Sequence, residues 1–178
     1  AQMRQGMDAA QATGAEIERP GMLARLAEAH GKVGRVAEGL NLLDEATAVM
    51  GKTEERQWEA ELYRLKGQLT LQKSKTSLKP VSDKSHTSLE QVTTSQGKLP
   101  VSLEAKAEEY FQKAIEIARK QQAKSLELRA AMSLARLWQQ QDKQHEAHNM
   151  LSEIYHWFTE GFNTKDLQEA KVLLDELA

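Results

Sequence analysis

The chain has 178 residues, of which 40% are hydrophobic and only 5% aromatic, and its 24 basic and 26 acidic residues leave a net charge of −2. This near-balance argues against binding to nucleic acid or to an anionic membrane. Cysteine is absent, which excludes disulfides, thiolate metal sites and a cysteine nucleophile.

Good helix formers (Ala, Leu, Glu, Gln, Lys and Arg) dominate the composition, and no run alternates with the period of a strand. No apolar run approaches the roughly 20 residues that span a bilayer, and no signal peptide is visible. We therefore predict an all-α protein in the cytoplasm. A spacing of large and small residues recurs about every forty positions, which is typical of a right-handed α-solenoid of antiparallel helix pairs, a tetratricopeptide-like superhelix.

The first two predicted elements are a half-repeat over 1–15, with its helix at 2–14, and repeat 1 over 19–51, with helices at 20–32 and 35–50. Pro20 falls at a helix start, where its missing N–H costs least. The repeat-1 positions that carry the tetratricopeptide spacing are Leu26, Ala27, His30, Gly34, Gly39, Leu43 and Ala46. One period before Leu43 and Ala46 stand Met3 and Gly6. This register and the start at Ala1 suggest a chain taken from within a longer array.

Repeat 2 is predicted over 54–121, with helices at 54–73 and 103–121 and a flexible insert at 74–101. Gly39, Ala107 and Ala147 are the small residues at one position of the repeat. Ala107 precedes Ala147 by 40 residues, one repeat length, but follows Gly39 by 68, so repeat 2 contains 28 additional residues. Eleven of the 31 residues over 72–102 are Ser or Thr, too polar to order themselves by burial. A tolerated insertion is the plain interpretation, and a phosphorylated or partner-binding loop is the functional one. Ser102 is the predicted N-cap of the second helix.

Repeat 3 is predicted over 124–159, with helices at 125–141 and 144–159, and a capping helix over 163–178. Asp142 takes the place of the usual turn glycine, since Asp also suits turns. Asn163 or Thr164 is the predicted cap of the last helix, which should cover the open end of the stack. We expect Trp138 to be a core residue, and Trp157 and Phe158 to pack under the last helix.

Three blocks resemble a known group of proteins: WEAELYRLKG at 58–67, QAKSLELRAAMSLARLW at 122–138 and WFTEGFNTKDLQEA at 157–170. They resemble the C-terminal tetratricopeptide region of large bacterial signalling proteins. In those proteins a class III adenylate/guanylate cyclase, or another regulatory domain, is joined to an AAA-type ATPase. The resemblance implies that both activities lie outside these residues. None of the three blocks is a catalytic motif, so no catalytic residue carries over.

Two short motifs resemble catalytic or metal-binding motifs but lack the residues or the spacing that such sites require. Gly51-Lys52-Thr53 mimics the end of a phosphate-binding loop, but Ala46 stands where that motif needs its first glycine. His145 and His148 are three residues apart without the spacing of a zinc site. We therefore predict no catalytic residue, no metal and no cofactor.

The predicted binding surface is a concave groove lined by the first helix of each repeat. Its positions, mapped from the repeat register, are Ala24, Glu28, Gly31, Glu61, Arg64, Gln68, Gln72, Arg129, Met132, Arg136, Gln139 and Gln140. The set becomes basic towards repeat 3, and Arg forks recognise carboxylates. We expect a peptide or domain with acidic groups as ligand; the alternative is a solvated groove whose Arg residues pair with neighbouring Glu.

The function expected from these features is that of a non-catalytic protein-interaction or regulatory module. Its partner would be a protein or peptide, including upstream domains of its own chain. The alternative is a self-association scaffold that makes the parent protein a homodimer. A small-molecule sensor would need an enclosed apolar pocket, which the sequence does not reveal.

Overall fold

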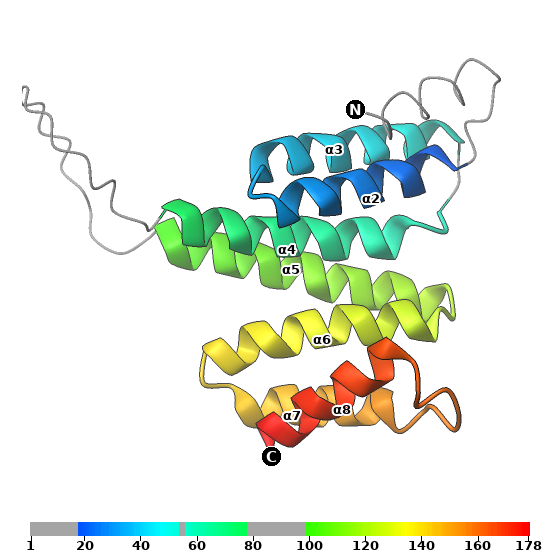
Figure 1. The fold of residues 1–178 in the computed structure, drawn as a ribbon, viewed down its shortest axis with the longest axis vertical. Coiled ribbons are helices and arrows are strands. Elements are labelled where there is room, and N and C mark those ends of the chain that lie inside the picture. The colour runs from blue at the N-terminus through cyan, green and yellow to red at the C-terminus, as the bar shows by residue number, and fades with distance from the viewer. Residues whose placement is uncertain (1–17, 54–55, 78–98) are drawn as a thin grey trace, which may run out of the picture.

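The computed structural model describes residues 18–53, 56–77 and 99–178. Within these ranges the fold is all-α, with seven helices and no strand. Figure 1 shows them stacked along the long axis of the molecule. The helices are α2 (Arg19–Lys32), α3 (Val36–Thr53), α4 (Glu59–Ser77), α5 (Leu99–Lys120), α6 (Lys124–Gln140), α7 (Gln144–Tyr155) and α8 (Lys165–Leu177). No described helix is both long enough and apolar enough to cross a bilayer.

The helices form two layers. Each helix packs against the next in the chain, and α2 also contacts α4, α4 contacts α6, and α6 contacts α8. In contrast, α3, α5 and α7 make no such contacts with one another within the described residues. The even-numbered helices therefore form a continuous layer, whereas the odd-numbered helices stand apart on the other side.

Small residues stand where helices cross, as the repeat spacing predicts. A Cβ atom at Gly67 of α4 would lie 2.6 Å from Cε1 of Phe111 in α5, and one at Gly39 would lie 3.0 Å from the carbonyl oxygen of Ala27. Ala107 and Ala147, the equivalents of Gly39, are fully buried. The absence of larger side chains at these positions allows the close approach of neighbouring helices.

Three turns between helices share one geometry. Gly34, Gln122 and Asp142 have left-handed backbones, with φ of 80°, 55° and 59°. The residue after each of them donates its N–H to a carbonyl five positions back, at 2.9 Å in each case: Arg35 to His30, Ala123 to Ala118 and Lys143 to Trp138. This is the Schellman arrangement that satisfies the last carbonyls of a helix. The prediction that Asp142 replaces a turn glycine is confirmed.

The core is divided into two main clusters. One joins α2, α3 and α4 around residues such as Leu23, Leu43 and Leu65. The other joins α5 to α8, with Phe111 and Leu134 among its members. A smaller cluster between α4 and α5 lies beside them. The boundary between the two main clusters falls between α4 and α5, the helices of the predicted repeat 2, which the smaller cluster and the contact of Gly67 with Phe111 connect.

Several helix ends differ from the predictions. Ser102 is not an N-cap, because α5 begins three residues earlier, at Leu99. Pro100 lies in the first turn, where a missing N–H breaks no helical hydrogen bond. The insert is correspondingly shorter than predicted, since residues 74–77 and 99–101 are helical.

The other ends shift by a few residues. Helix α3 continues through Gly51 to Thr53, α4 begins at Glu59 rather than 54, and α7 ends at Tyr155 rather than 159. Thr164 does occupy the N-cap of α8, although its side chain makes no capping hydrogen bond. The predicted helix over 2–14 and most of the insert lie outside the described residues.

Candidate functional site

The residues predicted to line a groove lie on α2, α4 and α6, but they differ in exposure. The buried members are Ala24, Gly31, Glu61, Arg64 and Met132. The half-buried or exposed members are Glu28, Gln68, Gln72, Arg129, Arg136, Gln139 and Gln140. Met132 is 3% exposed and belongs to the α5–α8 core, so it does not present a surface to a ligand.

A buried ion network ties α4 to α6. The Glu61 carboxylate accepts hydrogen bonds from Nε and Nη2 of Arg64 at 2.8 and 2.7 Å, and Nη2 of Arg129 lies 3.1 Å from it. Burial acts to lower the pKa of Arg64, but the Glu61 carboxylate outweighs it and the pKa is raised above its usual value. Arg64 also donates to Oε1 of Gln68 at 3.0 Å. These groups satisfy one another, so the network is part of the fold rather than a free recognition surface.

The two arginines of α6 also face acids of α8. Nε of Arg129 lies 3.9 Å from Asp166, and Nη2 of Arg136 donates to Glu169 at 3.3 Å. Both side chains of the Arg136–Glu169 pair are more than 40% exposed, whereas Glu61 is 8% exposed. Of these arginines, Arg136 is therefore the one that a ligand could reach most easily.

An open cleft of about 310 Å³ lies between α4 and α6, and it contains part of the predicted set. Its apolar lining comes from Leu71, Phe111 and Leu137, and its polar lining from Gln68, Gln72, Ser133, Arg136 and Gln140. The predicted groove positions do not include Leu71, Phe111, Ser133 and Leu137. Three of these could have been found, because Ser133 and Leu137 share a helix face with Arg136 and Gln140, and Leu71 shares one with Gln68 and Gln72.

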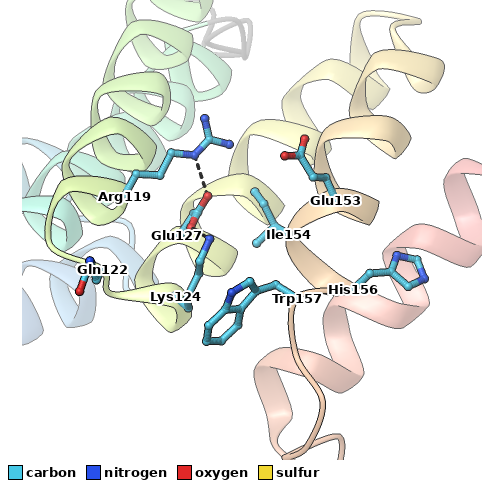
Figure 2. Close-up of a pocket in the computed structure, with 8 residues that line it drawn as sticks. All are labelled: Arg119, Gln122, Lys124, Glu127, Glu153, Ile154, His156 and Trp157. Atoms are coloured by element: carbon cyan, nitrogen blue, oxygen red, sulfur yellow. Dashed lines mark hydrogen bonds and ion pairs between the residues drawn. The ribbon is translucent and has the colours of Figure 1, made fainter.

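A larger hollow, of about 850 Å³, lies at the opposite face of α6, where α5 and α7 stand apart (Figure 2). Its lining residues are Arg119, Gln122, Lys124, Glu127, Glu153, Ile154, His156 and Trp157. None of these lining residues is among the predicted groove positions. The signal available was the Lys124–Glu127 pair three residues apart, followed much later by a Trp at a helix end.

Glu127 organises one wall of this hollow. Its carboxylate is 2% exposed and accepts hydrogen bonds from Nε of Arg119 and Nζ of Lys124, both at 2.7 Å. Burial acts to raise the pKa of Glu127, but these two cations more than offset it and the pKa lies below its usual range. The carboxylate thus stays charged and holds both cations in place.

Trp138 and Trp157 differ in burial and packing. Trp138 is half-buried, packs against the α5–α8 core and donates from Nε1 to Glu108 at 2.9 Å, in line with its predicted core position. Trp157 does not pack under α8 as predicted, because α7 ends two residues before it and its side chain is left 59% exposed. Phe158 does pack partly against the core.

His145 of α7 and His156, the residue after α7, make local polar contacts. Nε2 of His145 lies 3.0 Å from Asn149, and Nδ1 of His156 lies 2.7 Å from the carbonyl oxygen of Ser152. In the part of the chain that the structure describes, no three His, Asp or Glu side chains are placed to hold a metal ion.

Comparison with known proteins does not assign this chain to a family: no family model matches it, and no curated protein sequence is similar to it.

Proposed function

We propose that the chain is a non-catalytic protein-interaction module of tetratricopeptide-like type, which binds a peptide or a domain segment between α4 and α6. The observation that carries this proposal is the α4–α6 cleft, which combines an apolar lining with exposed polar groups. Because its three sequence blocks resemble the C-terminal region of large bacterial signalling proteins, we propose that the module regulates such a protein, with a cyclase or an ATPase domain.

The cleft favours a segment with an apolar side chain next to an acidic one. The apolar side chain would pack on Leu71, the half-buried apolar residue of the lining, since Phe111 and Leu137 are each only 1% exposed, and the carboxylate would take the place of Glu169 at Arg136. That exchange costs little, since exposed ion pairs contribute roughly 0–1 kcal/mol. Exposed amides such as Gln140 suit the backbone of an extended peptide.

The polar groups of the cleft favour binding over catalysis. The hydroxyl of Ser133 donates to the carbonyl of Arg129 at 2.9 Å, and among the described residues no histidine or carboxylate lines the cleft to activate it as a nucleophile. The lining groups can donate and accept hydrogen bonds, which is what recognition of a peptide requires.

The test is a charge reversal at Arg136. We expect Arg136→Glu to weaken calorimetric binding of the separately expressed ATPase domain of the parent protein by at least about tenfold. Arg35→Glu is the matched control, because Arg35 is exposed and pairs loosely with Glu38 at 3.7 Å, away from the cleft. Equal affinities for the wild type and Arg136→Glu, or equal losses in both variants, would contradict the proposal.

Sedimentation separates this function from self-association. We expect the wild-type chain to remain a monomer at micromolar concentration, with the α4–α6 cleft free for a partner. A tight dimer that Arg136→Glu dissociates would favour the alternative, in which the same face joins two copies of the parent protein.

A further inference from the structure

The hollow between α5 and α7 is separate from the α4–α6 cleft. Around the axis of α6, Glu127 lies about half a helical turn and Lys124 about a third of a turn away from Arg136. The hollow exists because α5 and α7 do not contact each other in the described chain, so that side chains of the α5–α6 turn and the end of α7 face one another across an open space.

In the hollow, the guanidinium group of Arg119 can bind a further acceptor. Arg119 uses Nε to bind Glu127, and Figure 2 shows its two terminal nitrogens turned away from that carboxylate. The Arg119 side chain is 54% exposed, so a ligand can reach it. Glu153 on the facing wall brings the acidic and basic side chains of the whole lining into balance, so the attraction for a carboxylate comes from Arg119 itself, whose guanidinium fork matches a carboxylate in geometry.

Trp157 gives the hollow an apolar contact surface. Trp157 is 59% exposed. Its ring stands edge-on to the ring of Phe158, with 5.3 Å between the two ring centroids, and Phe158 packs against the core. Nζ of Lys124 lies 5.4 Å from the centroid of the Trp157 ring. Large aromatic side chains fixed next to cations are the residues that most often dominate the energy of a protein interface.

We propose that this hollow is a second docking site, for a peptide segment of a partner protein that carries a carboxylate next to a bulky apolar side chain. The carboxylate binds the terminal nitrogens of Arg119, and the apolar side chain packs on Trp157 above Ile154. Glu153 on the opposite wall fixes the direction of the segment, because it repels a second acidic residue and accepts a backbone N–H or a basic group.

The experiment uses a phage-displayed library of random twelve-residue peptides, selected on the whole chain. We expect enrichment of peptides with an acidic residue beside Leu, Ile, Phe or Trp. Their synthetic versions should shift Trp fluorescence to the blue, since Trp157 is the most exposed of the three tryptophans and becomes covered. We expect Trp157→Ala to weaken their binding at least about tenfold and Arg119→Gln to weaken it several-fold.

The controls separate this site from the α4–α6 cleft and from misfolding. Val172→Ala removes another exposed apolar side chain, 57% exposed on α8, and should leave the affinity unchanged. Gln at position 119 keeps a hydrogen-bond donor for Glu127, and circular dichroism with thermal unfolding verifies that each variant folds. The proposal is overturned if no such peptides are enriched, or if the enriched peptides bind Trp157→Ala as well as the wild type. It is likewise overturned if they lose affinity with Arg136→Glu instead, because they would then report on the cleft.

Discussion

Gly67 of α4 faces the ring of Phe111 in α5, and its missing side chain leaves room for that ring. The contact that a Cβ atom would make there, at 2.6 Å, is with the ring of Phe111, which is only 1% exposed. We expect Gly67→Ala to lower the free energy of unfolding by about 1–3 kcal/mol, the usual cost of overpacking a core. Urea unfolding followed by circular dichroism measures this change.

Gly51 supplies the matched control for that substitution. It also lies within a helix, α3, but a Cβ atom there would meet nothing within 4 Å. Gly51→Ala should raise the free energy of unfolding by up to about 1 kcal/mol, because alanine loses less backbone entropy than glycine on folding. A similar loss of stability in both variants would contradict our explanation of Gly67.

Residues of this kind can be predicted from sequence, because the size needed at a crossing is repeated in every helix pair. Gly39, Ala107 and Ala147 stand at equivalent positions, and Asp142 keeps the left-handed turn that Gly34 has in repeat 1. Side-chain partners are harder to predict. The Glu61–Arg129 contact joins residues 68 positions apart, and no local pattern indicates that the arginine is already bound.

At the scale of the helix, Glu127 connects the end of α5 to the start of α6. Its pKa is lower in the folded chain than in the unfolded chain, so its contribution to stability is fully present above the ordinary value near 4.5 and is lost as the pH falls through the folded value. We expect Glu127→Gln to lower the free energy of unfolding by about 1–3 kcal/mol at pH 7, the range for hydrogen bonds to charged groups. This difference from the wild type should shrink at pH 3, as measured by urea unfolding at both pH values.

Glu116 is the control for the effect of Glu127. Lys113 and Lys120 lower its pKa to about 2, but it is exposed on a single helix, where water and salt screen the attraction. Glu116→Gln should therefore change stability little at pH 7. If Glu127→Gln costs the same at pH 3 as at pH 7, the contribution of Glu127 does not depend on its charge.

Helix ends could be predicted only where a single residue type dictates them. Pro20 and Thr164 mark helix starts as expected. The start of α5 was predicted wrongly, because Ser102 is a residue type that often caps a helix. Pro100, two residues earlier, is equally suited to a first turn, and the helix begins there instead, at Leu99. Helix α7 ends at Tyr155 without a Gly or Pro at that end, and for this reason the exposure of Trp157 was missed.

The lining of the candidate site could also be predicted only in part. Helical periodicity placed Gln68 on one face of α4 and Arg136 and Gln140 on one face of α6, and all three line the cleft. The contribution of Phe111 was not predictable in this way, because it comes from the second helix of a pair and reaches the cleft past Gly67.

For the whole molecule, the divided core predicts that destabilisation stays local. Leu173 of α8 is 3% exposed and belongs to the α5–α8 cluster, whereas Leu43 of α3 is fully buried in the α2–α4 cluster. Each Leu→Ala change should cost about 2–5 kcal/mol within its own cluster. In a stack whose helix pairs contact only their neighbours, opening spreads outward from the weakened pair.

Hydrogen exchange measured by mass spectrometry under native conditions tests this directly. In Leu173→Ala we expect amides of α7 and α8 to exchange at least about tenfold faster, while those of α2 and α3 keep the wild-type rate. Leu43→Ala should give the opposite pattern, with α4 and α5 intermediate in both variants because their contact at Gly67 and Phe111 joins the two clusters. A uniform acceleration across all helices in either variant would mean that the chain opens as one cooperative unit, contrary to the divided core.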